Sequence, residues 1–101
     1  MTDNKIIHTL MEEELAEANR IHPLFQSPHE AYAVILEELE EAEEELQWIR
    51  KQLGQMWSLI RQDCGAEEIL HQIKGHAVFA AQEIIQVGAM AQKALDSLYK
   101  E

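Results

Sequence analysis

The sequence predicts an all-α protein, a helical bundle of three main helices per chain that is completed by homo-oligomerisation. Apolar residues recur at steps of three and four along three segments, which is the spacing of amphipathic helices. No stretch alternates apolar and polar residues with the β-branched enrichment of a strand. At 101 residues the chain is one domain, residues 1–101. We expect helices at about 4–19, 28–62 and 66–99.

The first expected helix, residues 4–19, carries a single apolar stripe. Its members recur at helical spacing and are Ile7, Leu10, Met11, Leu15 and Ala18. The segment "RIHPLFQSPHE" follows, and Pro23 disfavours helical conformation in the residue before it. This segment therefore separates the first helix from the second.

The second expected helix, residues 28–62, has a strong start signal. Ser27 can cap the helix, Pro28 suits its first position, and Glu30 completes a capping box. Its expected packing seam is Tyr32, Ile35, Leu39, Ala42, Leu46, Ile49, Leu53 and Met56. A helix this long would project beyond one small core, so either Gly54 kinks it or a second subunit covers it. We expect a homodimer or homotetramer.

The third expected helix, residues 66–99, begins after "DCGAEE". Gly65 can end the preceding helix, and the acidic Glu67 and Glu68 suit a helix start. Its expected seam is Ala77, Ala81, Ile84, Gly88, Ala91, Leu95 and Leu98. The small residues on this helix should let another helix approach it closely; they include Ala77, Ala80, Ala81, Gly88, Ala89, Ala91 and Ala94.

Charge excludes several classes of partner. The net charge is −11 and the pI is near 4.8, which would repel nucleic acids and anionic membrane surfaces. The N-terminus lacks the pattern of a signal peptide, and no apolar run approaches the roughly 20 residues of a membrane span. We therefore expect a cytoplasmic protein. The single cysteine, Cys64, is expected as a thiol in or near a turn.

Glutamate dominates the stretch "LEELEEAEEEL", and its members divide by helical position. At about 100° per residue, Glu38 and Glu41 lie on one side of the seam at neighbouring heights, while Glu37, Glu40 and Glu44 point elsewhere. The same construction places Glu83 and Gln86 beside the seam of the third helix. If the seams pack together, three carboxylates and an amide line one pocket. All-oxygen ligands of this kind suit Mg²⁺ or Mn²⁺. The alternative is a solvated acidic face.

A family resemblance supports the metal hypothesis. Residues 37–41, "EELEE", match the EExxE motif of the MazG-like all-α nucleoside triphosphate pyrophosphohydrolases, and "EIIQ" at 83–86 falls where that family has ExxD. The wider stretches "SPHEAYAVILEELEEAEEEL" and "QEIIQVGAMAQKAL" resemble a phage and prophage branch, covering roughly residues 20–98. The resemblance implies Mg²⁺ at Glu38, Glu41 and Glu83, with Glu37 adjacent. It also implies a nucleoside triphosphate substrate, attacked by water between its α and β phosphates.

Gln86 departs from the family pattern. A glutamine carbonyl can coordinate Mg²⁺ weakly, but it adds no charge and takes no proton from water. Glu45, one turn beyond Glu41, could compensate. We expect metal activation of water, with Glu38 or Glu41 orienting it. The alternative function is a helical oligomer whose site has decayed, acting as a nucleotide-binding or protein-interaction module.

Other residues carry weaker functional signals. Lys93 lies two turns beyond Gln86 and could contact a phosphate, although a solvated lysine is the plainer expectation. His29 and His22 flank the connecting segment and could touch a nucleotide. Trp48 and Trp57 suit a core edge, a subunit contact or a base. Glu68 and His71 form an ExxH, half of a di-iron motif, which would need a second copy of the chain.

Overall fold

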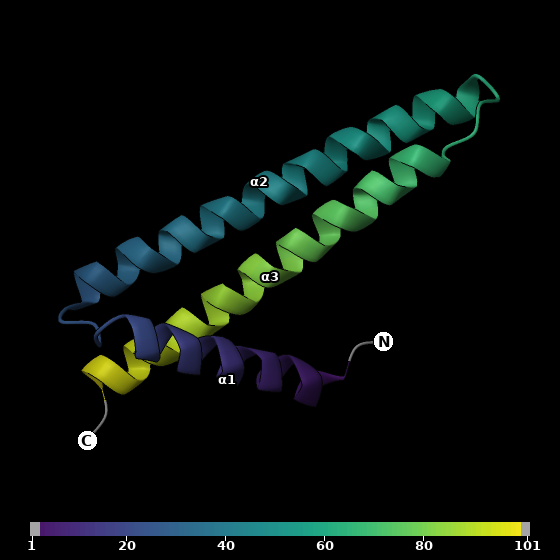
Figure 1. The fold of residues 1–101 in the computed structure, drawn as a ribbon. Coiled ribbons are helices and arrows are strands. Elements are labelled where there is room, and N and C mark those ends of the chain that lie inside the picture. The colour runs from purple at the N-terminus through teal and green to yellow at the C-terminus, as the bar shows by residue number, and fades with distance from the viewer. Residues whose placement is uncertain (1–2, 100–101) are drawn as a thin grey trace.

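The computed structural model describes residues 3–99, and its described part consists of helices without a strand (Figure 1). The helices are α1 (Asn4–Ile21), α2 (Pro28–Arg61) and α3 (Glu67–Leu98). The predicted all-α class is confirmed, and each helix end lies within two residues of the expected one. Residues 1–2 and 100–101 of the expected domain lie outside the described residues.

The helices form a long hairpin with a shorter helix across one end. α2 and α3 run antiparallel along the full length of the molecule, and α1 lies across the C-terminal part of α3 (Figure 1). The overall dimensions are 61 × 27 × 20 Å. Within residues 3–99, no helix combines the length and the apolar character needed to cross a membrane.

The seam between α2 and α3 corrects the sequence prediction. Half of the expected α2 seam is buried or half-buried: Ile35, Ala42, Ile49 and Met56. The other half is exposed: Tyr32, Leu39, Leu46 and Leu53. The inner seam of α2 instead combines the first group with Ala31, Glu38, Glu45 and Gln52. The predicted line thus merged two parallel stripes that differ by one residue, or about 100° around the helix.

The inner seam of α3 differs from the prediction in the same way. Its buried and half-buried members are Ile69, Ile73, His76, Ala80, Glu83, Val87 and Met90. The expected members Ala77, Ala81, Ile84, Ala91 and Leu95 are exposed. Small side chains bring the helices together, since Ala42 is 0% and Ala80 is 7% exposed.

Glycine and alanine bring α1 close to α3. Ala89 is 0% exposed, and a Cβ atom on Gly88 would lie 2.5 Å from Met11 Cε. The expectation that the small residues of α3 admit another helix is confirmed at Gly88. Gly54, by contrast, lies inside an uninterrupted α2, with open space where its Cβ would be.

The connection between α1 and α2 is fastened at two points. The Ser27 side chain accepts a hydrogen bond from the Glu30 backbone N–H at 3.2 Å, and Pro28 occupies the first helical position, as predicted. Phe25 is 6% exposed, and its backbone N–H donates to Ser97 Oγ at 3.2 Å. The connection is therefore anchored on the C-terminal part of α3.

The turn between α2 and α3 uses Asp63 where Gly65 was expected. Asp63 has φ 56°, while no described glycine has a positive φ. The Cys64 N–H donates to Leu59 O at 2.9 Å and the Asp63 N–H to Ile60 O at 3.1 Å. These two bonds form a Schellman motif, whose left-handed position usually holds glycine. Cys64 is exposed in this turn, as predicted.

We predict that Asp63→Gly stabilises the protein by about 0.5–1 kcal/mol, because glycine adopts the left-handed conformation without a steric penalty. Gly65→Ala is the matched control. Gly65 has an ordinary φ and open space at its Cβ position, so this change should be neutral or slightly stabilising. Urea denaturation would compare the variants. A stability loss in Asp63→Gly would contradict this account of the turn.

Candidate metal centre

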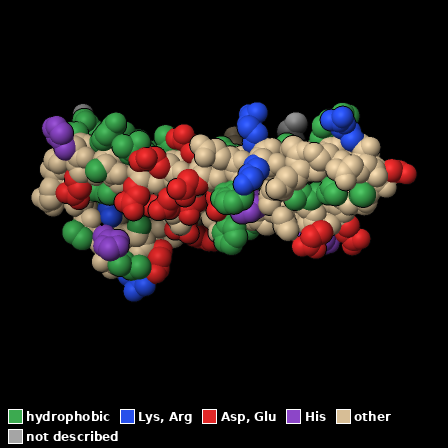
Figure 2. Space-filling view, turned by 90° about the horizontal axis from the view of Figure 1, so that it is seen from above, with side chains coloured by type: hydrophobic (Ala, Val, Ile, Leu, Met, Phe, Trp, Pro, Cys, Tyr) green, Lys and Arg blue, Asp and Glu red, His purple; other side chains and the backbone are tan. Residues whose placement is uncertain are grey.

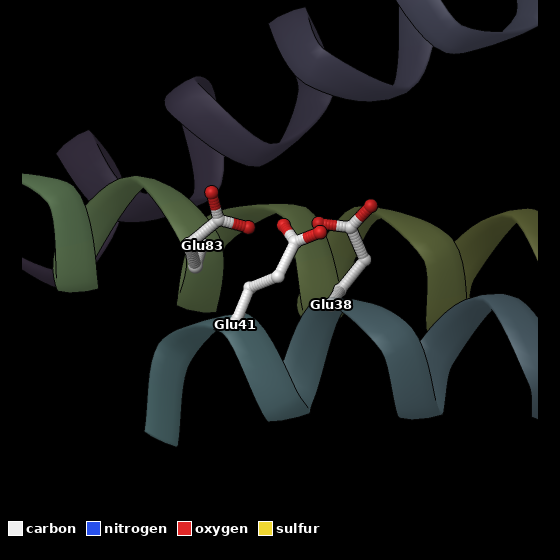
Figure 3. A group of neighbouring side chains, drawn as sticks. All are labelled: Glu38, Glu41 and Glu83. Atoms are coloured by element: carbon white, nitrogen blue, oxygen red, sulfur yellow. The ribbon is translucent and has the colours of Figure 1, made fainter. Parts of the chain in front are cut away.

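Three carboxylates from two helices converge on one point. Glu38 and Glu41 extend from α2 and Glu83 from α3, and each offers an oxygen that lies within 4.8 Å of the other two (Figure 3). Within the described residues, this is the one group of three or more potential metal ligands whose ligand atoms lie that close together. The hypothesis that Glu38, Glu41 and Glu83 share one site therefore has the required geometry.

Helix geometry and register together create the cluster. Glu38 and Glu41 are three residues apart, so they lie one turn apart on the same side of α2. Glu83 lies on the inner seam of α3, and the register of the two antiparallel helices places it opposite Glu38. Glu38 and Glu83 are half-buried and Glu41 is exposed. The centre thus has a half-buried side in the seam and an exposed side at its rim.

Gln86 joins the cluster as a hydrogen-bond donor. With its amide nitrogen turned toward the carboxylates, it donates to Glu38 Oε2 at 2.5 Å and to Glu83 Oε2 at 3.2 Å. The amide N–H groups donate hydrogen bonds to carboxylate oxygens that would otherwise repel each other. If the amide rotates, its carbonyl oxygen faces the same point instead.

Burial and the proximity of the carboxylates raise the pKa values of Glu38, Glu41 and Glu83. Burial is the main cause of the raised pKa of Glu38 and of Glu83, and neighbouring negative charges add to it. The pKa of Glu41 rises mainly through its hydrogen bond with Glu83 and the charge of that group. In the absence of a cation, each of the three carboxyl groups therefore loses its proton at a higher pH than an ordinary glutamate does.

The donor set fits a hard divalent cation. Three carboxylates and a side-chain amide offer only oxygen ligands, which Mg²⁺ and Mn²⁺ prefer over softer metals. The open side at Glu41 leaves room for water or substrate oxygens, which Mg²⁺ usually retains. Glu37 is exposed on the neighbouring face of α2 and lies outside the cluster.

A cavity of about 500 Å³ opens beside the cluster, between α1, the α1–α2 connection, α2 and α3. Glu38 and Gln86 belong to both the cluster and the cavity wall. The wall also contains Glu14, Glu17, Ala18, Ile21, His22, Pro23, Phe25, Glu30, Val34, Met90 and Lys93. His22 therefore faces the cavity, whereas His29 is exposed and is not part of its wall.

Lys93 differs from the expected solvated lysine. It is only 2% exposed, and its Nζ lies 5.0 Å from the centre of the Phe25 ring. Among residues 3–99, no carboxylate lies within ion-pair distance of this ammonium group. Phe25, in the connection between α1 and α2, lies against Lys93, a contact that sequence periodicity along α3 does not reveal.

Glu45 pairs with His76 and lies outside the carboxylate cluster. Its Oε2 lies 2.5 Å from His76 Nδ1 across the seam, and both side chains are about one-quarter exposed. Trp48 stacks on His76 with the ring centres 5.8 Å apart. The expectation that Glu45 compensates for Gln86 is therefore not supported by its contacts. Sequence analysis missed His76, although its spacing of seven residues from Glu83 was a usable signal.

The remaining candidates lie apart from the cluster. Glu68 and His71 are exposed near the turn at the far end of the hairpin, where His71 pairs loosely with Glu67 at 3.8 Å. Trp57 is 60% exposed on α2. Neither the ExxH half-motif nor Trp57 lines the cavity beside the metal centre.

We predict that the metal-free protein becomes more stable as the pH falls from 7 toward 5. The folded state has raised pKa values at the cluster, so it binds protons that the unfolded chain does not bind until about pH 4.5. Glu38→Gln should raise the free energy of unfolding at pH 7 by a few tenths of a kcal/mol to about 1 kcal/mol, given solvent screening. It should also flatten the pH dependence.

Urea denaturation at several pH values would measure these effects, with Glu40→Gln as the matched control. Glu40 is exposed on the same helix outside the cluster, so its loss changes the net charge equally. Equal behaviour of the two variants would show that the cluster carries no special repulsion.

Comparison with known proteins identifies no relative: no protein family, no curated protein and no solved structure matches the chain. The geometry of the centre and of its cavity is therefore the basis for assigning a function.

Proposed function

We propose that the protein is a Mg²⁺-dependent nucleoside triphosphate pyrophosphohydrolase, which converts a nucleoside triphosphate to the monophosphate and pyrophosphate. One observation carries the proposal: three carboxylates converge beside a cavity whose wall holds a buried lysine. Such an enzyme would serve to remove unwanted nucleotides from the cellular pool.

Glu38, Glu41 and Glu83 would hold the cation, Mg²⁺ or Mn²⁺, and the carbonyl oxygen of a rotated Gln86 would add a neutral ligand. When bound, the ion supplies neutralisation of phosphate charge and a lowered pKa for coordinated water. A protein with a net charge of −11 needs such a cation to accept a triphosphate at all. A bound cation would also offset the repulsion among the three carboxylates.

The other contributions come from the chain itself. Lys93 would neutralise a phosphate from the cavity side, since its ammonium group has no ion-pair partner among the described residues. Glu41 is exposed at the rim, where it would orient the attacking water, and Glu38, which belongs to both the cluster and the cavity wall, is the other residue that could do so. Hydrolysis would then break the bond between the α and β phosphates.

The second candidate is a helical oligomer that binds nucleotide without hydrolysing it. Gln86 favours this function, because its hydrogen bonds satisfy Glu38 and Glu83 without a metal. The exposed hydrophobic residues along α2 favour assembly into a homodimer or homotetramer in either case. The two candidates differ in whether pyrophosphate is released.

We predict that the wild-type protein releases pyrophosphate from a panel of nucleoside triphosphates when Mg²⁺ or Mn²⁺ is present. Glu38→Gln should lower the rate at least 100-fold, because it removes a charged ligand at the centre. Gln86→Asp adds a fourth carboxylate, so it should tighten Mn²⁺ binding roughly 10-fold and lower metal-free stability. A coupled pyrophosphate assay and Mn²⁺ titration would measure both.

The outcomes separate the two candidates. Nucleotide binding without pyrophosphate release by either the wild type or Gln86→Asp would favour the non-enzymatic oligomer. Absence of both Mn²⁺ binding and nucleotide binding would contradict the metal centre itself. The Glu40→Gln variant is the matched control, because it removes a glutamate from the same helix outside the cluster.

We predict that Lys93→Met weakens nucleotide binding at least 10-fold while leaving Mn²⁺ affinity nearly unchanged. Methionine fills much of the same space against Phe25 but carries no charge. Thermal-shift titrations with nucleotide plus Mg²⁺ and with Mn²⁺ alone would separate the effects. Equal nucleotide affinity in the variant would remove Lys93 from the proposed site.

A further inference from the structure

An unpartnered hydrophobic stripe runs along nearly the whole of α2. Its members, called the outer stripe here, are Tyr32, Leu36, Leu39, Leu46, Leu53, Trp57 and Ile60, and they are 38–69% exposed. They follow the alternating steps of four and three residues that define a coiled-coil seam. Glu43 and Arg50 fill the two positions in that series that are not hydrophobic. Within residues 3–99, no helix packs on this stripe.

The outer stripe is symmetric about Leu46. Counting outward from it, the series pairs position 43 with 50, 39 with 53, 36 with 57 and 32 with 60. A second copy of α2 laid antiparallel across the first would therefore place Leu39 against Leu53 of the partner subunit. It would place Leu36 against Trp57 of the partner subunit, and Leu46 against itself. An isologous contact with twofold symmetry requires such a self-complementary surface.

The charges of α2 are divided at the same residue. All glutamates of α2 precede Leu46, and all its arginines and lysines follow it. Acidic side chains accordingly gather over the N-terminal half of α2, while basic ones appear over its C-terminal half (Figure 2). Parallel pairing would bring glutamates against glutamates. Antiparallel pairing instead brings Glu43 against Arg50 of the partner subunit, twice per dimer, and polar residues within a helical seam specify how the helices align.

We propose that the outer stripe of α2 binds a second copy of this chain, with the two α2 helices antiparallel and the twofold axis at Leu46. The exposed stripe of α3 lies on the same side of the hairpin as the outer stripe of α2. On each helix the exposed residues come one position after those of the inner seam, and because the two helices run antiparallel, this offset turns both stripes toward the same side. Its small residues, among them Ala77 and Ala81, let the partner approach closely.

The metal centre faces away from this interface. Glu41 precedes Leu46 by five residues, which places it about 140° around the helix from Leu46. Dimerisation therefore leaves the rim of the centre open. The proposed dimer does not depend on the proposed enzymatic function, and it can be tested without metal or nucleotide.

Sedimentation equilibrium without metal would test the charge pairing. The wild type should be a dimer, and Arg50→Glu should weaken it at least 10-fold, because Glu43 would then face a glutamate. The double variant Glu43→Arg/Arg50→Glu restores opposite charges and should recover the dimer. Lys51→Glu makes the same charge change one residue away from the stripe and serves as the matched control. A monomeric wild type, or equal effects of Arg50→Glu and Lys51→Glu with no recovery in the double variant, would overturn the proposal.

Disulfide cross-linking would test the axis. In a Cys64→Ser background, Leu46→Cys should form a covalent dimer on oxidation, because the two sulfur atoms meet at the axis. Tyr32→Cys should not, because the two positions lie 28 residues apart along the paired helices, roughly 42 Å. Parallel pairing would cross-link both variants. Cross-linking at position 32, or its absence at position 46, would contradict the proposed arrangement, and circular dichroism would check that each variant is folded.

Discussion

The antiparallel register of α2 and α3 is the constraint on which the candidate site depends. A slip of one helical turn, about 5.4 Å, would carry Glu83 away from Glu38 and Glu41. Polar contacts recur along the inner seam at steps of seven residues on α2. Glu38 meets Glu83 and Gln86, Glu45 pairs with His76, and Gln52 bonds Gln72 at 3.1 Å. The Oε1 of buried Gln52 has no hydrogen-bond partner among the described residues. Each of these pairings would be lost in another register, so they favour the observed alignment at some cost in stability.

This polar seam leaves a thin hydrophobic core. Among the described residues, the buried hydrophobic side chains are Phe25, Ile69 and four alanines. Most of the large hydrophobic side chains of α2 lie on the outer stripe instead. The carboxylate cluster adds repulsion to a fold that has little apolar burial to offset it. A second subunit on the outer stripe would add apolar burial, and a cation at the cluster would reduce the repulsion among the carboxylates.

The sequence predicted the helices and the cluster well because both depend on local spacing. Ser27 and Pro28 marked the start of α2, and the three-residue step from Glu38 to Glu41 placed both on one side. It failed where a choice required tertiary contacts. Two stripes of α2, one residue apart, have nearly equal hydrophobic periodicity, and only the position of α3 shows which is inside. Phe25, from a distant connection, lies against Lys93, a contact that no local pattern along α3 reveals.

The glutamate run from 37 to 45 shows how one helix can serve three surfaces. Glu38 and Glu45 lie in the inner seam, Glu41 lies at the rim of the metal centre, and Glu43 lies in the outer stripe. Because successive residues turn by about 100°, neighbouring glutamates need not share an environment. A substitution at Glu43 therefore tests assembly and one at Glu41 tests the centre, although they are two residues apart. The glutamates of the run therefore serve different purposes, and the surroundings of each position decide which one.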